Sequence, residues 1–178
     1  VDLGTVYTKS DEPEKAKSAW DQTIKLIKED EQVFTVANSF NAIRQFDYSI
    51  AAYLKGRKIS QTNYPYSFEL AEIYKTKGDK LAMINELLDA LEINESYIQS
   101  VQNALQTSFG NDTDSKQNEL LKTELLKRIA KNSDKTILSE LLIWMQIQQK
   151  DWEGAFIQAK ALDKRKKEEG NRVMALAQ

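Results

Sequence analysis

The amino-acid sequence predicts an all-α fold made of repeated helix pairs, and three observations lead to this prediction. Leu, Ala, Glu, Lys, Gln and Ile dominate the 178 residues, and most of these residue types favour helix. Only 6 glycines and 2 prolines interrupt the chain. In addition, a spacing of small and aromatic residues recurs after 33 and then 34 positions, as expected when one structural unit is repeated.

The recurring spacing is clearest in the segment from Leu70 to Ile93, where a turn at Gly78-Asp79 separates two helical patterns. Successive separations of 3, 9, 4 and 3 residues are shared by three sets: Gly4, Tyr7, Ala16, Trp20 and Thr23; Ala37, Phe40, Ser49, Tyr53 and Gly56; Ala71, Tyr74, Met83, Leu87 and Ala90. A further set has the same separations near the C-terminal end: Ile143, Gln146, Ala155, Ala159 and Leu162. The sets predict helix, tight turn and second helix, several times over.

Each position in the set has a physical role. The small residue of the first helix, such as Ala37, allows the paired helix to approach closely, and the ring three places later lies on the same face. In the second helix, positions four apart, such as Ala16 and Trp20, form one apolar stripe. Each pair keeps an uncovered face until the next pair stacks on it.

This small-aromatic-small-aromatic-small pattern, on helix pairs of about 34 residues, resembles the tetratricopeptide repeat (TPR) family. The resemblance implies an α-α superhelix, a helical-repeat solenoid, of about five TPR-like units in a single array over 1–178. The predicted units are 1–29, 30–63, 64–97, 98–135 and 136–169, and 170–178 is the start of a further or capping helix.

Some of the predicted turns have clear sequence signals and one is irregular. The first lies at 10–13, with Ser10 or Asp11 as N-cap and Pro13 in the first turn of the next helix. The fourth unit is irregular, because it has a long turn at 110–115 and places Leu105 and Ser108 at the small and ring positions. Its second helix, from about Lys116, is expected to direct Leu121, Leu125 and Ile129 inward.

Composition argues against several classes of function. The net charge is -2, which shows no basic excess for binding nucleic acid. The chain has no Cys and no His, so the commonest catalytic bases and metal ligands are missing and we expect neither an enzyme nor a cofactor. No apolar run approaches the roughly 20 residues of a membrane span. We expect a soluble piece of a longer protein, cytoplasmic or periplasmic, with any targeting segment upstream of Val1.

Other charged motifs have ordinary explanations. The carboxylate clusters at 11–12, 29–31 and 168–169 fall at predicted turns and helix ends, where solvation or capping accounts for them. Asp112 and Asp114 are spaced as in a calcium loop but lack its central Gly and distal Glu. The basic run at 160–167 is interleaved with acids and closes a helix. The glycosylation triplets at 94–96 and 111–113 are short enough to arise by chance.

The predicted function is non-catalytic binding of a protein or peptide partner in the concave groove that the TPR resemblance implies, lined by the first helix of each pair. The inward residues implied are Thr5, Thr8, Phe34, Asn38, Asn41, Phe68, Glu72, Lys75, Gln102, Gln106, Glu140, Trp144 and Ile147. Their amides can bond a partner's backbone, and their rings are either binding anchors or packing residues. The family's clamp for a terminal carboxylate is not supported, because Thr5 and Glu72 replace its basic and Asn residues. The alternatives are a self-assembly module, forming a homo-oligomer, and an accessory region of a larger protein.

Overall fold

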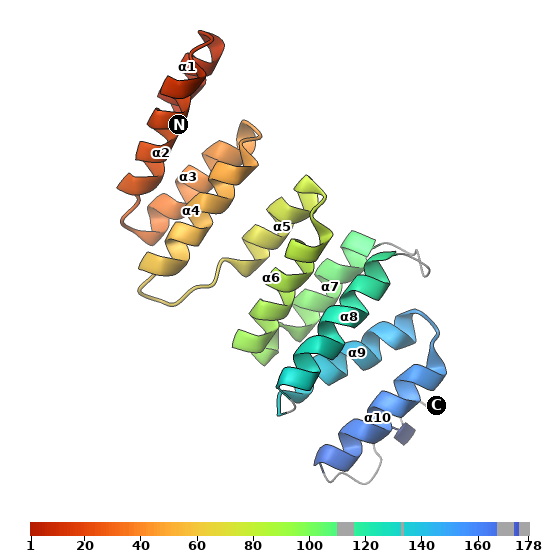
Figure 1. Ribbon diagram of the computed structural model, residues 1–178. Helices are drawn as coiled ribbons and strands as arrows, with labels where there is room; N and C mark the ends of the chain where they lie inside the picture. The colour runs from red at the N-terminus through yellow and green to blue at the C-terminus, as the bar shows by residue number, and fades with distance from the viewer. Residues whose placement is uncertain (110–115, 133, 167–172, 175–178) are drawn as a thin grey trace. The chain divides into compact units, whose positions relative to one another are not determined.

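The protein is all-α, as predicted. The structure, a computed structural model, describes residues 1–109, 116–132, 134–166 and 173–174, and these residues form ten α-helices and one 3-10 helix (Figure 1). The helices pack largely as consecutive hairpins. The chain divides into two compact units, Val1–Asp79 and Lys80–Gln178, which are described separately below. Their boundary falls at the predicted turn of segment 64–97, so the two helices of that segment belong to different units.

The N-terminal unit contains five helices: α1 (Asp2–Lys9), α2 (Pro13–Leu26), α3 (Asp30–Ala42), α4 (Phe46–Ile59) and α5 (Ser67–Lys77). Helix α1 pairs with α2 and α3 pairs with α4, while α4 also contacts α2 and α5. Ala16, Trp20 and Phe40 form one buried cluster. A second cluster joins α3, α4 and α5 through Ala37, Tyr53 and Leu70. The small residues predicted at helix contacts, Gly4, Ala37 and Ala71, are all buried, so the predicted packing face is confirmed.

Four helix ends share one hydrogen-bonded turn, in which a left-handed residue is followed by a residue whose N–H reaches back five positions. The pairs are Glu12 to Tyr7, Gln45 to Phe40, Asp79 to Tyr74 and Asp151 to Gln146, each with an N–O distance of 2.9 Å. The left-handed residues are Asp11, Arg44, Gly78 and Lys150, with φ of 58°, 58°, 78° and 59°. This is the Schellman motif, which satisfies the last carbonyls of the helix. Every acceptor is the residue predicted at the ring position of its set.

The first of these turns corrects the predicted N-cap. Pro13 is the first residue of α2, as predicted, but the residue before it is Glu12, and no side chain caps the helix. Asp11 instead takes the left-handed conformation of the preceding turn. The prediction of Ser10 or Asp11 as N-cap was therefore wrong, because the Schellman turn extends one residue further than a simple cap would.

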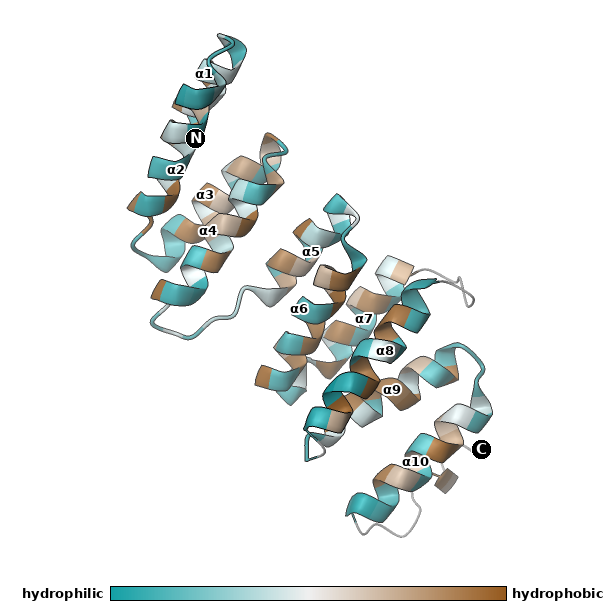
Figure 2. Ribbon diagram, viewed as in Figure 1, coloured by the Kyte–Doolittle hydropathy of each residue, from teal (hydrophilic) through white to brown (hydrophobic). Residues whose placement is uncertain are grey.

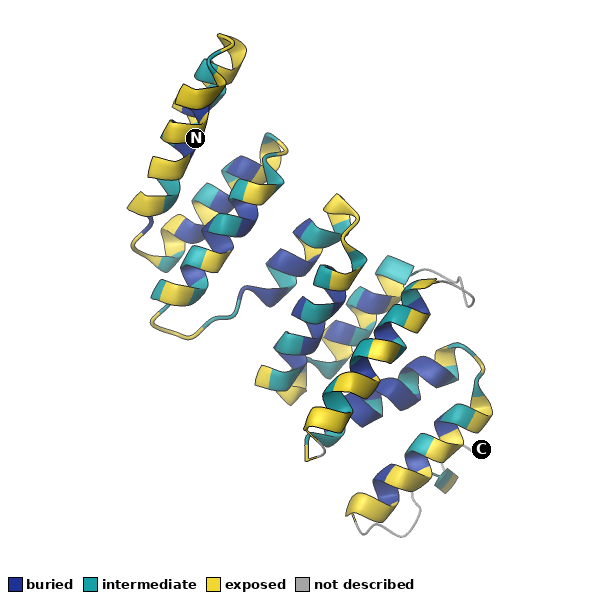
Figure 3. Cartoon of the chain, viewed as in Figure 1, coloured by how far each residue is buried: buried dark blue, intermediate teal, exposed yellow. Residues whose placement is uncertain are grey.

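The C-terminal unit contains α6 (Lys80–Ile93), η1 (Glu95–Tyr97), α7 (Ile98–Phe109), α8 (Lys116–Lys131), α9 (Thr136–Gln148) and α10 (Trp152–Lys166). Helix α6 contacts α7, α8 and α9, and α10 pairs with α9. Helices α6 and α9 have more buried residues than the other helices of this unit. Figure 3 shows α9 as largely dark blue and α6 as a mixture of dark blue and teal, and Figure 2 shows apolar residues in brown on both. A helix that is apolar on most sides needs neighbours on several faces, and these two helices have them.

The irregular fourth segment is only partly described. The predicted long turn at 110–115, with its calcium-like and glycosylation motifs, lies outside the described residues. Leu105, Leu121 and Leu125 are buried and Ile129 is partly buried, so the predicted inward positions are confirmed. Of the predicted further helix at 170–178, only Val173 and Met174 are described, and Val173 packs against the cluster of Ile143 and α10 residues.

Candidate protein-binding surface

The thirteen predicted groove residues lie in both compact units, and none of them is buried. Thr8, Phe34, Asn38, Asn41, Glu72 and Gln106 are exposed, whereas Thr5, Phe68, Lys75, Gln102, Glu140, Trp144 and Ile147 are partly exposed. The residues predicted on the packing face of the same helices, such as Ala37 and Leu105, are buried. The separation of packing face from outer face therefore agrees with the sequence pattern within each helix.

Phe34 of α3 lies at the edge of a four-ring cluster in the N-terminal unit, here called the Phe34 cluster, made of Phe34, Tyr53, Tyr64 and Tyr66. The centroid of the Phe34 ring lies 6.0 Å from Tyr53, 6.2 Å from Tyr64 and 5.3 Å from Tyr66. Phe34 is nevertheless 37% exposed, whereas Tyr53 and Tyr66 are buried. The ring is thus packed against tyrosines on one side and open to solvent on the other.

Polar groups behind the Phe34 cluster hold its rings in place. The Tyr66 hydroxyl donates to Asp30 Oδ1 at 2.8 Å, and the Tyr64 hydroxyl donates to Glu69 Oε1 at 2.9 Å. Burial, followed by the hydrogen bond to Asp30 and nearby negative charge, raises the pKa of Tyr66 above its ordinary value. Burial, followed by the charge of Glu69, also raises the pKa of Tyr53. These tyrosines stay neutral at physiological pH and act as hydrogen-bond donors.

The segment before α5 was not predicted to contribute to this surface. Helix α5 begins at Ser67, so Tyr64, Pro65 and Tyr66 lie outside it, and Tyr66 is left-handed with φ of 51°. Arg57 of α4 donates from Nε to the Pro65 carbonyl and from Nη2 to Ser67 Oγ at 3.1 Å. Pro65, flanked by two tyrosines, was the available signal, since the residue before a proline is disfavoured in helix.

Several predicted groove residues are already engaged within their own unit. The hydroxyls of Thr5 and Thr8 donate to the carbonyls of Val1 and Gly4, at 3.3 and 3.0 Å. Lys75 pairs with Glu72 at 3.2 Å. Asn38 Oδ1 accepts from the Tyr53 hydroxyl at 3.3 Å, which orients the amide on the α3 surface. The residues that best fit an exposed contact surface are therefore Phe34, Asn38 and Asn41, which lie along α3.

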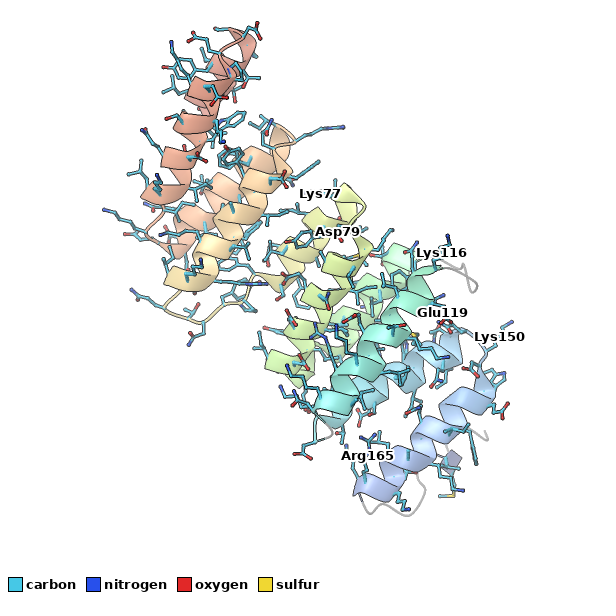
Figure 4. All side chains as sticks on the ribbon, viewed as in Figure 1. Lys77, Asp79, Lys116, Glu119, Lys150 and Arg165 are labelled. Carbon is cyan, nitrogen blue, oxygen red and sulfur yellow. The ribbon has the colours of Figure 1, made fainter. Side chains whose placement is uncertain are left out.

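In the C-terminal unit, the predicted residues lie on α7 and α9. Glu140 pairs with Lys166 at 3.1 Å, and Ile147 packs against Ile143 and the buried residues of α10. Arg165, labelled in Figure 4 near the end of α10, donates to Ser139 Oγ of α9 at 2.9 Å. The α9 residues thus take part in holding α10, whereas Gln106 of α7 is exposed.

A polar pocket between α6 and α8 was missed from the sequence. It has a volume of about 330 Å³, and Arg128 is one of the residues that line it. Nη1 of Arg128 lies 2.6 Å from Asp89 Oδ1 and 2.8 Å from Glu92 Oε2, and Nη2 donates to Asn85 Oδ1 at 2.9 Å. The guanidinium is satisfied by the protein itself, so this arrangement joins two helices. The contacts span 36 to 43 residues of sequence, and no local pattern signals them.

One of the predicted carboxylate clusters contributes a residue to the packing, whereas the cluster at 168–169 lies outside the described residues. Asp30, in the middle of the acidic run 29–31, accepts hydrogen bonds from Tyr66 and from the Ser60 hydroxyl. Within the described ranges, no group of three His, Cys, Asp or Glu residues is arranged to hold a metal ion. In the same ranges, no helix is both long and apolar enough to cross a lipid bilayer.

Comparisons of the chain with protein-family models, with curated proteins and with solved structures find no match. The geometry of the surfaces described above is therefore the basis for any functional inference.

Proposed function

We propose that this chain is a non-catalytic scaffold of TPR-like helix pairs that binds a protein or peptide segment in a concave groove, on the exposed faces of its first helices. The recurring Schellman turn supports the repeat interpretation, because it falls at the same position of four sequence sets. In such an arrangement the first helices of successive pairs line one concave face of a superhelix.

The single observation that carries the proposal is the state of Phe34. A ring that is 37% exposed, yet held by three tyrosines, presents apolar surface whose own conformational freedom is already restricted. Rigid aromatic groups of this kind supply much of the affinity in protein interfaces, because little entropy is lost when the partner covers them.

Amides beside the ring complete the surface. Asn38 and Asn41 are exposed on α3, at one and two helical turns from Phe34. An amide offers one acceptor and two donors, which suits it to the backbone of an extended segment. The expected ligand is therefore a peptide that places an apolar side chain on Phe34 and its main chain against the two amides.

The test is a selection of peptides from a random library on the immobilised chain, followed by affinity measurements on purified variants. Asn41→Ala is the most informative variant, because Asn41 is exposed and its removal should leave the fold intact. We expect it to weaken the selected peptide about tenfold, the effect of losing one or two interfacial hydrogen bonds. Gln22→Ala, an exposed amide on α2, is the matched control. Equal affinity for Asn41→Ala and wild type would contradict the proposal.

A further inference from the structure

Helix α10 directs its small residues inward and its large apolar residues outward. Ala155, Ala159 and Leu162 are fully buried against α9. Trp152, Phe156 and Ile157 are 57%, 46% and 55% exposed. Three large apolar side chains within two turns of one helix form a surface that packing among the described residues of this unit does not explain. We call these three residues, with Glu153 and Lys160, the α10 face.

The corresponding positions of α4 show what such a face does. Phe46 and Ile50 follow the Schellman turn at the end of α3 by one and five residues, as Trp152 and Phe156 follow the one at the end of α9. Ile50 is only 8% exposed, because it packs in a cluster with Leu70 and Ile73 of α5, and Phe46 packs against the same cluster. In α4 these positions are covered by α5. In α10 the same positions carry residues as large or larger and remain exposed.

The two charged residues of the α10 face favour a second, antiparallel copy of the same helix as its neighbour. Glu153 and Lys160 are both exposed, and within the part of the chain that the structure describes neither makes an ion pair. They lie seven residues apart, two turns along the same side of the helix. The midpoint between them falls between Phe156 and Ile157. A second α10 lying antiparallel about a twofold axis at that midpoint brings Glu153 of each copy to Lys160 of the other.

The same register matches the apolar residues. It places Phe156 against the partner's Phe156 on one side of the axis and Ile157 against the partner's Ile157 on the other side, because the twofold axis keeps equivalent side chains on the same side of the contact. A parallel arrangement would instead set Glu153 against the partner's Glu153 and Lys160 against the partner's Lys160, which is unfavourable. The α10 face is therefore complementary to itself in the antiparallel orientation, as an isologous interface requires.

We propose that the α10 face is a homodimerisation surface on which α10 of a second copy docks antiparallel. This surface is separate from α3, and the proposal does not depend on peptide binding there. The Phe156 and Ile157 side chains provide the apolar centre, and the two symmetric pairs of Glu153 and Lys160 fix orientation and register.

The experiment is sedimentation equilibrium of the whole 178-residue chain over a wide concentration range. We expect the apparent mass to rise from the monomer value of 20.4 kDa towards twice that value. Phe156→Glu should abolish the rise, because it places two like charges at the centre of the contact. Leu126→Glu, at an exposed leucine of α8, is the control and should leave it unchanged.

Charge exchange tests the register itself. Glu153→Lys and Lys160→Glu should each weaken association by roughly tenfold, since each creates two like-charge contacts in the symmetric dimer. The double variant, with both charges exchanged, should associate as tightly as wild type. All of these residues are exposed, so circular dichroism should show unchanged helicity. A chain that stays monomeric throughout, a dimer that Phe156→Glu leaves intact, or a double variant that fails to recover would each overturn the proposal.

Discussion

The indole of Trp20 occupies the space that a side chain on Gly4 would need. A Cβ atom added to Gly4 would lie 2.0 Å from Nε1 of Trp20, far inside contact distance. The same Nε1 donates to the carbonyl of Val1 at 3.1 Å, which fixes the ring against the backbone of α1. Helices α1 and α2 therefore approach so closely that only glycine fits, which is the role that the sequence spacing predicts for this position.

Substitution of Gly4 by Ala should therefore destabilise the protein, although alanine is the better helix former. Overpacking of this kind costs about 1–3 kcal/mol, which exceeds the gain in helix propensity. The measurement is urea unfolding followed by circular dichroism, with Lys9→Ala, an exposed α1 substitution, as control. A midpoint for Gly4→Ala at or above the wild-type midpoint would show that α1 and α2 are not packed in this way.

Phe40 and Tyr74 occupy the same position of the sequence pattern but differ in burial. Phe40 is fully buried among Trp20 and Tyr48, whereas Tyr74 is only partly buried. We expect Phe40→Ala to cost about 3–5 kcal/mol and Tyr74→Ala distinctly less. The free energies of unfolding of the two variants check this, and equal losses would be inconsistent with the difference in burial.

Tyr66 should make stability depend on alkaline pH. Its pKa in the folded protein is raised above the ordinary value of 10.0, so its stabilising contribution is complete below pH 10.0 and is lost as pH rises through the folded pKa. The free energy of unfolding should therefore fall above pH 10.0. Tyr66→Phe should lower stability at neutral pH, by about 1–3 kcal/mol for the lost bond to Asp30, and flatten the alkaline fall. If the free energy of unfolding fell by the same amount above pH 10.0 in wild type and in the variant, this role of Tyr66 would be contradicted.

Arg128 should be one of the most important polar residues of the C-terminal unit. It bonds Asp89, Glu92 and Asn85 of α6 from a position on α8, and its side chain is 15% exposed. We expect Arg128→Ala to cost about 2–4 kcal/mol, because two carboxylates lose their partner in a partly buried site. Arg128→Lys should recover only part of the loss, since an ammonium cannot match the planar fork. Lys127→Ala, at a neighbouring α8 residue whose side chain is 73% exposed, is the control for thermal unfolding measurements.

Much of the fold could be predicted because its signals are local. Helix pairs, tight turns and the buried positions Ala37, Met83 and Ala155 follow from spacing within about 34 residues. The left-handed residues Asp11, Arg44 and Lys150 could not be predicted with the same ease, because glycine, the usual signal, occurs only at Gly78.

The less predictable features depend on contacts between distant segments. Tyr66 reaches Asp30 across 36 residues, and this contact turns Phe34 from a lone exposed ring into the edge of a cluster. The sequence alone leaves open whether Phe34 is a packing or a binding residue, and the structure shows its ring packed against three tyrosines while 37% of the residue stays exposed. For this reason we expect Phe34→Ala to lower stability as well as binding, and Asn41 is the cleaner probe.

The most direct test of the account is amide chemical-shift mapping of the chain with a peptide selected for binding. The proposed function predicts that the largest shifts lie on the α3 surface, from Phe34 to Asn41, and that Asn41→Ala needs about tenfold more peptide to reach the same shifts. Shifts confined to the outer side of α2 or to α10 would contradict a binding surface on the first helices, and would remove the basis for assigning this chain a scaffold function at α3.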